Sequence, residues 1–110
     1  MIRPFECIMG TNLNSVWLEG TLLAEPVSNE IDPPTFRFPI EAPEPHEAAS
    51  VFLVEADDAA FDGCRPRLCR GREVRIIGRL HQRRWVDNDG FLQKEVKIIG
   101  EMVEPLGVPL

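Results

Sequence analysis

The sequence lacks any apolar run close to the roughly 20 residues that a membrane-spanning helix needs. Its N-terminus also lacks the long apolar stretch of a secretory signal peptide, so we expect a soluble, cytoplasmic protein. The chain has 110 residues, of which 44% are apolar and 27% charged. This balance excludes an intrinsically disordered chain, and the length allows one domain whose single core needs no disulfide or metal.

Cysteine is scarce, with three residues and no CxxC pair. The three are Cys7, Cys64 and Cys69. Only His46 and His81 could add nitrogen ligands, whereas a structural zinc site needs four well-spaced ligands. We therefore expect reduced thiols, with no bound metal or other cofactor, and the small number of cysteines fits a reducing compartment.

Catalytic motifs are missing as well. The sequence contains no GxSxG, no HExxH and no glycine-rich phosphate loop. The carboxylates of residues 41–47 are separated by prolines, which indicates a solvated loop rather than a pair for acid–base chemistry. We expect that the protein is not an enzyme.

The acidic total conceals a basic segment. The formal net charge is −6, from 12 basic and 18 acidic side chains. Residues 1–62 carry two cations against twelve carboxylates, a sum of −10, whereas residues 63–110 carry ten against six, a sum of +4. Residues 65–84 alone hold eight arginines and one acid, Glu73. Because nucleic-acid affinity depends on local charge, this segment is either a basic stripe or a set of solvated strand and turn charges.

The alternation of apolar and polar residues predicts five β-strands. They cover residues 14–23, 36–40, 50–55, 73–81 and 91–103, and the fourth continues extended through residue 87. Gly20 predicts a bend or bulge in the first strand. Pro39 has no amide donor, which places the second strand at a sheet edge or beside a bulge. In the fourth strand, the alternation puts Arg75, Arg79 and His81 on one face.

Two short elements complete the predicted fold. A helix of one or two turns begins at Asp57 or Asp58, because Gly63 and Pro66 would stop a longer one. Residues 88–90, Asn-Asp-Gly, tolerate positive φ and predict a hairpin turn before the last strand. Five strands with one short helix between the third and the fourth predict an all-β, five-stranded OB-fold barrel.

We expect the chain to comprise three parts. Residues 1–12 form an N-terminal extension, residues 13–106 the OB-fold domain and residues 107–110 a C-terminal tail. Phe5, Ile8 and Met9 in the extension could continue a strand or cover the barrel, and the sequence leaves both possibilities open.

Residues 79–91 form the most informative segment. Arg83 and Arg84 precede Trp85 directly, and the three residues lead into the predicted hairpin tip. Guanidinium groups for phosphate and a flat ring for a base are the two parts of a sequence-tolerant site for single strands. The alternative is that Trp85 packs on its own hairpin and covers part of the barrel.

Four stretches of the chain resemble the bacterial single-stranded-DNA-binding proteins. They are LNSVWLEGTLLAEPV at residues 13–27, TFRFPIEA at 35–42, LCRGREVRIIGRLHQRRWVDNDG at 68–90 and KEVKIIGEMVEPL at 94–106. Their order along the chain is that of the family. The most specific combination joins a Gly-Arg-Leu strand, an Arg-x-Trp-x-Asp segment, a glycine-tipped hairpin and a Glu-Val strand.

The resemblance implies an OB-fold that binds single-stranded DNA (ssDNA) without sequence preference, in replication, recombination or repair. It also implies a homo-oligomer, either a dimer or a tetramer. The family's stacking and basic positions match Phe52, Arg72, Arg75, Arg79, Arg83, Arg84 and Trp85 of this chain. Trp17 and Leu23 lie on the expected outward face of the first strand and support self-association, since exposed apolar side chains at a strand edge usually meet a partner.

Three features depart from the family pattern. The family's long basic hairpin between the second and third strands is replaced by the acidic EAPEPHEAAS. The position of a second stacking aromatic of the family falls near Glu55 to Asp57, where this chain has no aromatic residue. The chain ends without the glycine-rich linker and acidic tail through which the family recruits other proteins, so we expect no such recruitment if the sequence is complete. Two lost stacking residues, at about 1–3 kcal/mol each, would weaken binding by roughly two to four orders of magnitude.

These departures leave a second hypothesis open. The chain is then an OB-fold accessory module that binds proteins and has weak or lost DNA affinity. The two hypotheses predict different surroundings for the arginines of residues 65–84. They converge on one groove with Trp85 exposed if the chain binds DNA, and they pair with Asp57, Asp58, Asp62 and neighbouring acids if it is an accessory module.

Overall fold

The computed structural model describes residues 13–107, and our expectations for residues 1–12 and 108–110 lie outside the described residues. Six strands and two short 3₁₀ helices follow one another along the chain. They are β1 (Val16–Leu22), β2 (Val27–Ser28), β3 (Thr35–Ala42), β4 (Ser50–Asp57), η1 (Asp58–Phe61), η2 (Arg65–Arg67), β5 (Glu73–Val86) and β6 (Leu92–Pro105). No helix among these residues is long and apolar enough to cross a membrane.

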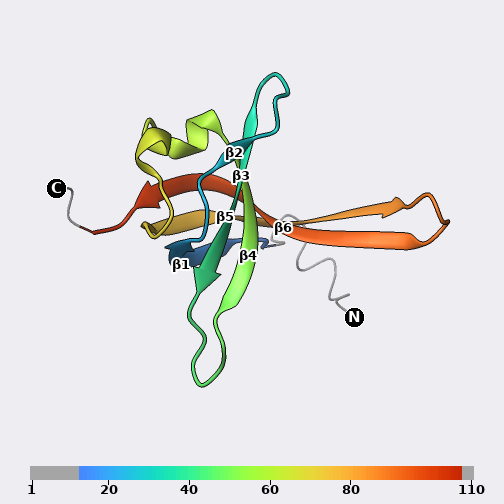
Figure 1. Ribbon diagram of the computed structural model, residues 1–110, viewed down its shortest axis with the longest axis horizontal. Coiled ribbons are helices and arrows are strands. Elements are labelled where there is room, and N and C mark those ends of the chain that lie inside the picture. Colours follow the sequence, from blue (N-terminus) through green and yellow to red (C-terminus); the bar gives the residue numbers. More distant parts are fainter. Residues whose placement is uncertain (1–12, 108–110) are drawn as a thin grey trace, which may run out of the picture.

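The strands form a closed barrel (Figure 1). Their order is β1-β5-β6-β4-β3-β2, and an additional pairing of β1 with β3 closes the ring. All pairs are antiparallel except β4 with β6, which is parallel. The two-residue β2 pairs only with β3, so five strands make the barrel, and the predicted five-stranded architecture is confirmed.

The barrel encloses one apolar core. Its largest fully buried side chains are Phe38, Phe61, Leu22, Ile40, Ile76, Val54, Val74 and Val103. In β3 the buried positions alternate with more exposed ones, as the period-two pattern predicts. Phe61 reaches the core from η1 and meets Phe36 edge to face, with 5.7 Å between the ring centroids. The short helix therefore closes one end of the barrel.

The predicted helix between the third and fourth barrel strands is a 3₁₀ helix of four residues. It begins after Asp57, whose carboxylate accepts a hydrogen bond of 2.9 Å from the Ala60 amide. Asp62 follows the helix in the left-handed conformation, at φ 45°, and Gly63 follows at φ 79°. Two such residues in succession turn the chain and keep the element short.

Gly20 lies where β1 approaches β3. A Cβ atom at Gly20 would lie 2.6 Å from the carbonyl oxygen of Glu41, closer than any side chain allows. β1 pairs with β5 through this position without a register shift, so Gly20 permits close backbone packing rather than a bulge. Pro39 accepts a hydrogen bond from the Leu23 amide on the edge of β3 that faces away from β4. β3 is paired with β4 on one side and with β2 and β1 on the other, so the sheet-edge position predicted for this strand is wrong. Pro39 is tolerated because it lies between the residues that pair with β2 and those that pair with β1.

The bulge of the barrel lies on β6. Ile77 of β5 pairs with Met102, but the next residue, Gly78, pairs with Gly100, so Glu101 is an extra residue on β6. A bulge bends its strand and increases the local twist. Past this point toward the arm, β5 has no further pairing with β1, whereas β6 stays paired with β4 as far as Ile98.

Candidate nucleic-acid interface

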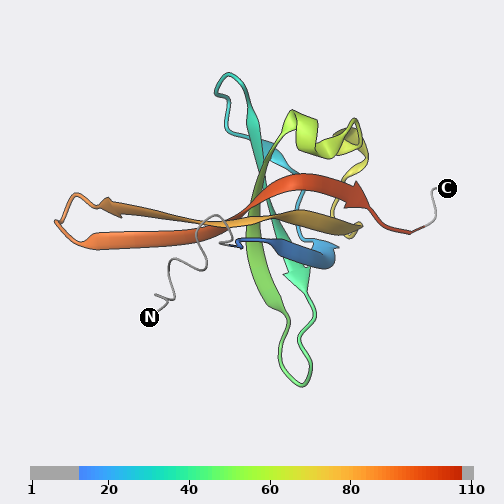
Figure 2. The ribbon, with the colours of Figure 1, turned by 180° about the vertical axis from the view of Figure 1, so that it is seen from behind.

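Residues 79–97 form a projecting hairpin, which we call the arm. β5 and β6 extend past the barrel as an antiparallel pair, on the side opposite η1 and η2 (Figures 1 and 2). Their ladder continues without a further shift to the pair Val86 and Leu92. The predicted fourth strand and its extended continuation are thus one strand of 14 residues.

The arm tip is held by Asp87. One of its carboxylate oxygens accepts hydrogen bonds from the amides of Asp89, at 3.0 Å, and Phe91, at 2.9 Å. The other accepts a bond of 2.8 Å from the side-chain amide of Gln93. The amide of Phe91 and the other donors hold the pKa of Asp87 below its ordinary value, because they stabilise the ionised form. Because an isolated two-stranded hairpin is only marginally stable, this cap helps to keep the arm formed.

The arm has two faces with different side chains. Residues directly opposite each other in an antiparallel pair lie on the same face. One face, which we call the arginine–tryptophan face, carries Arg79, His81, Arg83 and Trp85 of β5 and Gln93, Glu95 and Lys97 of β6. The other carries Leu80, Gln82, Arg84 and Val86 of β5 and Leu92, Lys94 and Val96 of β6. The arginine–tryptophan face therefore collects two of the predicted basic residues and the predicted stacking ring.

Arg83 and Trp85 are neighbours on this face. The central carbon of the Arg83 guanidinium lies 4.8 Å from the Trp85 ring centroid, in a cation–π arrangement. Arg83 is exposed and Trp85 is half-buried. Trp85 thus packs on its own hairpin, as one interpretation of the segment predicts, and still has access to solvent, as the other requires.

Arg84 and Arg75 lie in other surroundings. Arg84 is exposed on the opposite face of the arm, where its Nε donates to the side-chain oxygen of Gln82 at 3.0 Å. Arg75 lies on the barrel, where its guanidinium pairs with Glu19 at 3.4 Å and with Glu104 at 3.2 Å. Its charge is therefore largely compensated within the protein.

Arg72 and Phe52 do not join the arm residues. Arg72 directly precedes β5, at the end of that strand farthest from the arm, and its Nε is buried without a hydrogen-bond partner in the described structure. Phe52 is half-buried and packs against the apolar core, on the face of β4 that also carries Val54. The structure therefore brings together Arg79, Arg83 and Trp85 from the predicted set, and it places the other four elsewhere.

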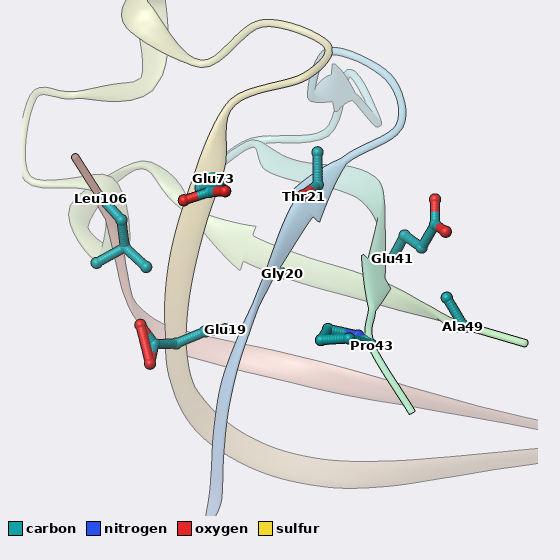
Figure 3. Close-up of a pocket in the computed structure, with 8 residues that line it drawn as sticks. All are labelled: Glu19, Gly20, Thr21, Glu41, Pro43, Ala49, Glu73 and Leu106. Carbon is teal, nitrogen blue, oxygen red and sulfur yellow. The ribbon is translucent and has the colours of Figure 1, made fainter. Parts of the chain in front are cut away.

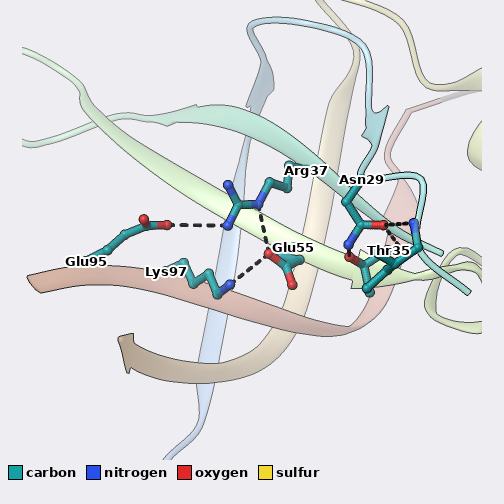
Figure 4. A network of polar contacts seen from close by, with 7 residues as sticks. Asn29, Thr35, Arg37, Glu55, Glu95 and Lys97 are labelled. Atoms are coloured by element: carbon teal, nitrogen blue, oxygen red, sulfur yellow. Dashed lines mark hydrogen bonds and ion pairs between the residues drawn. The ribbon is translucent and has the colours of Figure 1, made fainter. Parts of the chain in front are cut away.

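A network of four charged side chains joins the arm to the barrel, and sequence reasoning did not identify it (Figure 4). The carboxylate of Glu55 on β4 accepts hydrogen bonds from Lys97, at 2.8 Å, and from Arg37 on β3, at 2.9 Å. A second carboxylate, Glu95, lies 3.6 Å from the guanidinium of Arg37. Burial raises the pKa of Glu55, but the bonds from Lys97 and Arg37 outweigh it and hold the pKa below its ordinary value. Glu55 is therefore ionised at neutral pH and pairs with both cations.

A cavity of about 430 Å³ opens at the base of the arm. Arg79 lines it together with Thr35 and three carboxylates, Glu55, Asp57 and Glu101. Glu55 and Asp57, near the end of the third predicted strand, thus line the same cavity as the first basic residue of the arm. This end of the arginine–tryptophan face is mixed in charge.

A second cavity, of about 490 Å³, lies between β1, β3 and β5 (Figure 3). It is lined by Glu19, Glu41 and Glu73 among others. The side chains of Glu19 and Glu41 extend to opposite sides of β1 in Figure 3, so these carboxylates do not converge on one point. The cavity offers neither cations for phosphate nor a paired acid and base.

Some of the eight arginines of residues 65–84 pair with acids, as the accessory-module hypothesis predicts, and others do not. Arg65 pairs with Asp58 at 3.2 Å and lies over the Phe36 ring, and Arg75 pairs with acids as described. Among the described residues, Arg79 and Arg83 make no ion pair with a carboxylate. The arginines available to an external anion therefore include those of the arm.

Comparison with known proteins identifies the fold. No family model and no curated protein sequence matches the chain. Solved structures do match. The Plasmodium falciparum SSB in complex with ssDNA has a TM-score of 0.73 and 18% identity, over 88% of this chain and 97% of that chain. The mitochondrial single-stranded-DNA-binding protein Rim1 of S. cerevisiae also has a TM-score of 0.73, with 8% identity over 87% of this chain and 97% of its own.

A third solved structure is similar. The dimeric N-terminal domain of PriB from Thermoanaerobacter tencongensis has a TM-score of 0.67 and 20% identity, over 86% of this chain and 98% of that domain. Together with the barrel topology, these similarities establish that the chain has the OB-fold of single-stranded-DNA-binding proteins. The fold class predicted from the sequence is confirmed.

Proposed function

We propose that the chain binds ssDNA without sequence preference through the arginine–tryptophan face of the arm. The observation that carries the proposal is the placement of Arg79, Arg83 and Trp85 on one face of a projecting strand. The similar solved structures support it, because one of them is a complex with ssDNA. The binding serves replication, recombination or repair.

The chemistry of the face suits a single strand of any sequence. Every base has a π-face that can stack on an indole, and guanidinium groups attract phosphate regardless of sequence. Successive same-face residues of a strand lie about 6.5–7 Å apart. Arg79, His81, Arg83 and Trp85 therefore present cations and rings in a regular row along the arm.

The remaining predicted site residues have smaller parts in this proposal. Arg84 offers a cation to DNA that passes around the arm to its opposite face. Arg75 would have to leave two acids to bind phosphate. Phe52 would have to leave the apolar core to stack on a base.

The test is a titration of the intrinsic fluorescence of Trp17 and Trp85 with oligo-dT at low and at moderate salt. We expect quenching that weakens steeply as salt rises, because phosphate contacts release counterions from the DNA. No binding at low salt, with a long oligonucleotide and about tens of micromolar protein, would contradict the proposal. The accessory-module hypothesis would then replace it.

We further propose a binding role without catalysis, carried out in the cytoplasm. Two similar structures are named for ssDNA binding, which supports a binding role. Cys64 and Cys69 are free thiols, as is usual in a reducing compartment.

We also propose that the protein acts as a homo-oligomer, a dimer or a tetramer. Trp17 is 74% exposed on β1, and the register places it in one row with Ile77 of β5 and Met102 of β6, which is 48% exposed. An exposed apolar row across three strands favours burial against a second copy. Leu23, the other residue expected to face outward, is half-buried and contributes less exposed apolar surface for self-association.

A further inference from the structure

The network of Arg37, Glu55, Glu95 and Lys97 lies on the same face of the sheet as the arm residues. Arg37 pairs with Glu55 across β3 and β4, Glu55 pairs with Ile99 across β4 and β6, and Ile99 pairs with Arg79 across β6 and β5. Directly opposite residues share a face. The row from Arg37 to Arg79 therefore continues the arginine–tryptophan face onto the barrel.

Both cations of this network are already occupied by carboxylates. Lys97 has a side chain only 10% exposed and donates to Glu55, which is 17% exposed. Arg37 is more open, with a side chain 41% exposed, and it contacts Glu55 and Glu95 together. A phosphate that approaches Arg37 must compete with two acids for the same guanidinium.

We propose that Glu55 and Glu95 set the ssDNA affinity of this protein by occupying Arg37 and Lys97, which would otherwise extend the cationic surface from the arm to β3. The inference rests on the proposed function and names residues that limit it. Carboxylate and phosphate oxygens accept the same charge-assisted hydrogen bonds, so each carboxylate acts as an internal competitor of the DNA backbone. Weak binding then follows from the protein's own acids as well as from missing stacking rings.

The two carboxylates differ in how firmly they hold their partners. Glu55 makes two hydrogen bonds shorter than 3.0 Å. Glu95 lies 3.6 Å from Arg37, and its facing oxygen is buried without a hydrogen bond in the described structure. Removing the charge of Glu55 thus frees two cations, whereas removing that of Glu95 relieves one loose contact.

The experiment compares Glu55→Gln and Glu95→Gln with the wild type in binding to fluorescein-labelled oligo-dT over a range of salt concentrations. Glutamine keeps the size of the side chain and removes its charge. We expect E55Q to bind about tenfold more tightly at low salt and E95Q about threefold more tightly. The logarithmic salt slope of E55Q should be steeper by roughly 0.7–1.4, corresponding to one or two additional phosphate contacts on a single strand.

Glu25→Gln is the matched control, because it makes the same charge change in an exposed loop outside the network. We expect its affinity to stay within about twofold of the wild type. Equal gains in all three variants would overturn the inference, because they would report net charge alone. Adding Arg37→Gln to E95Q should abolish the gain, and a gain that persists would overturn the role of Arg37.

The outcomes separate this inference from the proposed function. If the wild type binds and neither E55Q nor E95Q binds more tightly, the inference is wrong and the proposed function stands. If neither the wild type nor any variant binds, both are wrong. A thermal melt establishes that each variant is folded, and E95Q keeps the test decisive should E55Q unfold, because Glu95 makes only the looser contact.

Discussion

The guanidinium of Arg83 lies over the indole ring of Trp85, with 4.8 Å between the guanidinium carbon and the ring centroid. The two residues are two positions apart on β5, and in a strand this spacing places both side chains on one face. The contact orders a cation and a ring together at the outer part of the arm. Each has a separate consequence for DNA binding.

Trp85 is expected to supply the stacking contribution. Trp85→Ala should weaken binding of labelled oligo-dT by roughly 5- to 150-fold, because one base–aromatic stack is worth about 1–3 kcal/mol. Trp85→Phe retains a π-face and should recover most of the loss. Fluorescence anisotropy of the DNA measures both, and an alanine variant that binds as the wild type does would remove Trp85 from the site.

Arg83 and its chain neighbour Arg84 form a matched pair, because they lie on opposite faces of the arm. Arg83→Gln should lower the affinity and reduce the logarithmic salt slope by roughly 0.7, the value for one phosphate on a single strand. Arg84→Gln makes the same charge change and should have the smaller effect on both quantities. A larger effect of Arg84→Gln would show that the opposite face is the main DNA contact.

Gly78 is expected to be essential for the junction between barrel and arm. A Cβ atom there would lie 2.0 Å from the carbonyl oxygen of Ile99, and this oxygen belongs to the backbone, which cannot move aside freely. Gly78→Ala should therefore lower the free energy of unfolding by about 3 kcal/mol or more. Urea denaturation measures the loss. Gly63→Ala, where a Cβ atom meets nothing within 4 Å but φ is 79°, should cost less, about 1 kcal/mol.

Asp87 should make the order of the arm tip depend on pH. Its pKa is lowered from the ordinary value of 3.8, first by the bond from the Phe91 amide and then by that from Gln93. A group whose pKa is lower in the folded state stabilises that state above its unfolded pKa, and the contribution is lost as pH falls through the folded value. The tip should thus be constant between about pH 5 and 8 and loosen below about pH 4.

Amide hydrogen exchange at Asp89 and Phe91 reports the order of the tip directly, because both amides donate to Asp87. In Asp87→Asn the tip should exchange faster at neutral pH and lose its acid dependence. Protection that is equal in the variant and the wild type at pH 7 would contradict the role of the carboxylate.

The apolar row of β1, β5 and β6 predicts the oligomeric state. Light scattering of the wild type at micromolar concentration should give the mass of a dimer or tetramer. Replacing exposed Trp17 and Met102 by serine should shift the mass toward that of the monomer, because it removes apolar area from the interface. A monomeric wild type would exclude this form of self-association. Val27→Ser, an exposed apolar residue on β2, is the control and should leave the mass unchanged.

Most of the fold could be predicted from local pattern. The period-two alternation identified all five barrel strands, because a strand with one face in the core repeats every second residue. It could not show that β5 and β6 continue as one ladder beyond the barrel, since Leu80 and Val96 keep the same alternation although they are 48% and 57% exposed. The sequence predicted a bend or bulge at Gly20 and could not show the close approach of β3, because that backbone is distant in the sequence.

The candidate site was also predictable only where it depends on local pattern. Arg79, Arg83 and Trp85 share a face because even numbers of positions separate them on one strand. This follows from the sequence alone. The hydrogen bonds of Arg75 with Glu19 and Glu104, and those of Glu55 with Arg37 and Lys97, join residues 18 to 56 positions apart. Such contacts carry no local signal.

By itself, the sequence determined which residues alternate between core and surface, where the hairpin turns, and that cations gather in the second half of the chain. Only the tertiary structure decided which of those cations remain available. Closing the barrel brings β3, β4 and β6 into register, and this sets Glu55 and Glu95 of the chain against Arg37 and Lys97 while Arg79 and Arg83 extend along the arm. The physical reason is that a charge acts through distance in space, and the strand pairings fix that distance.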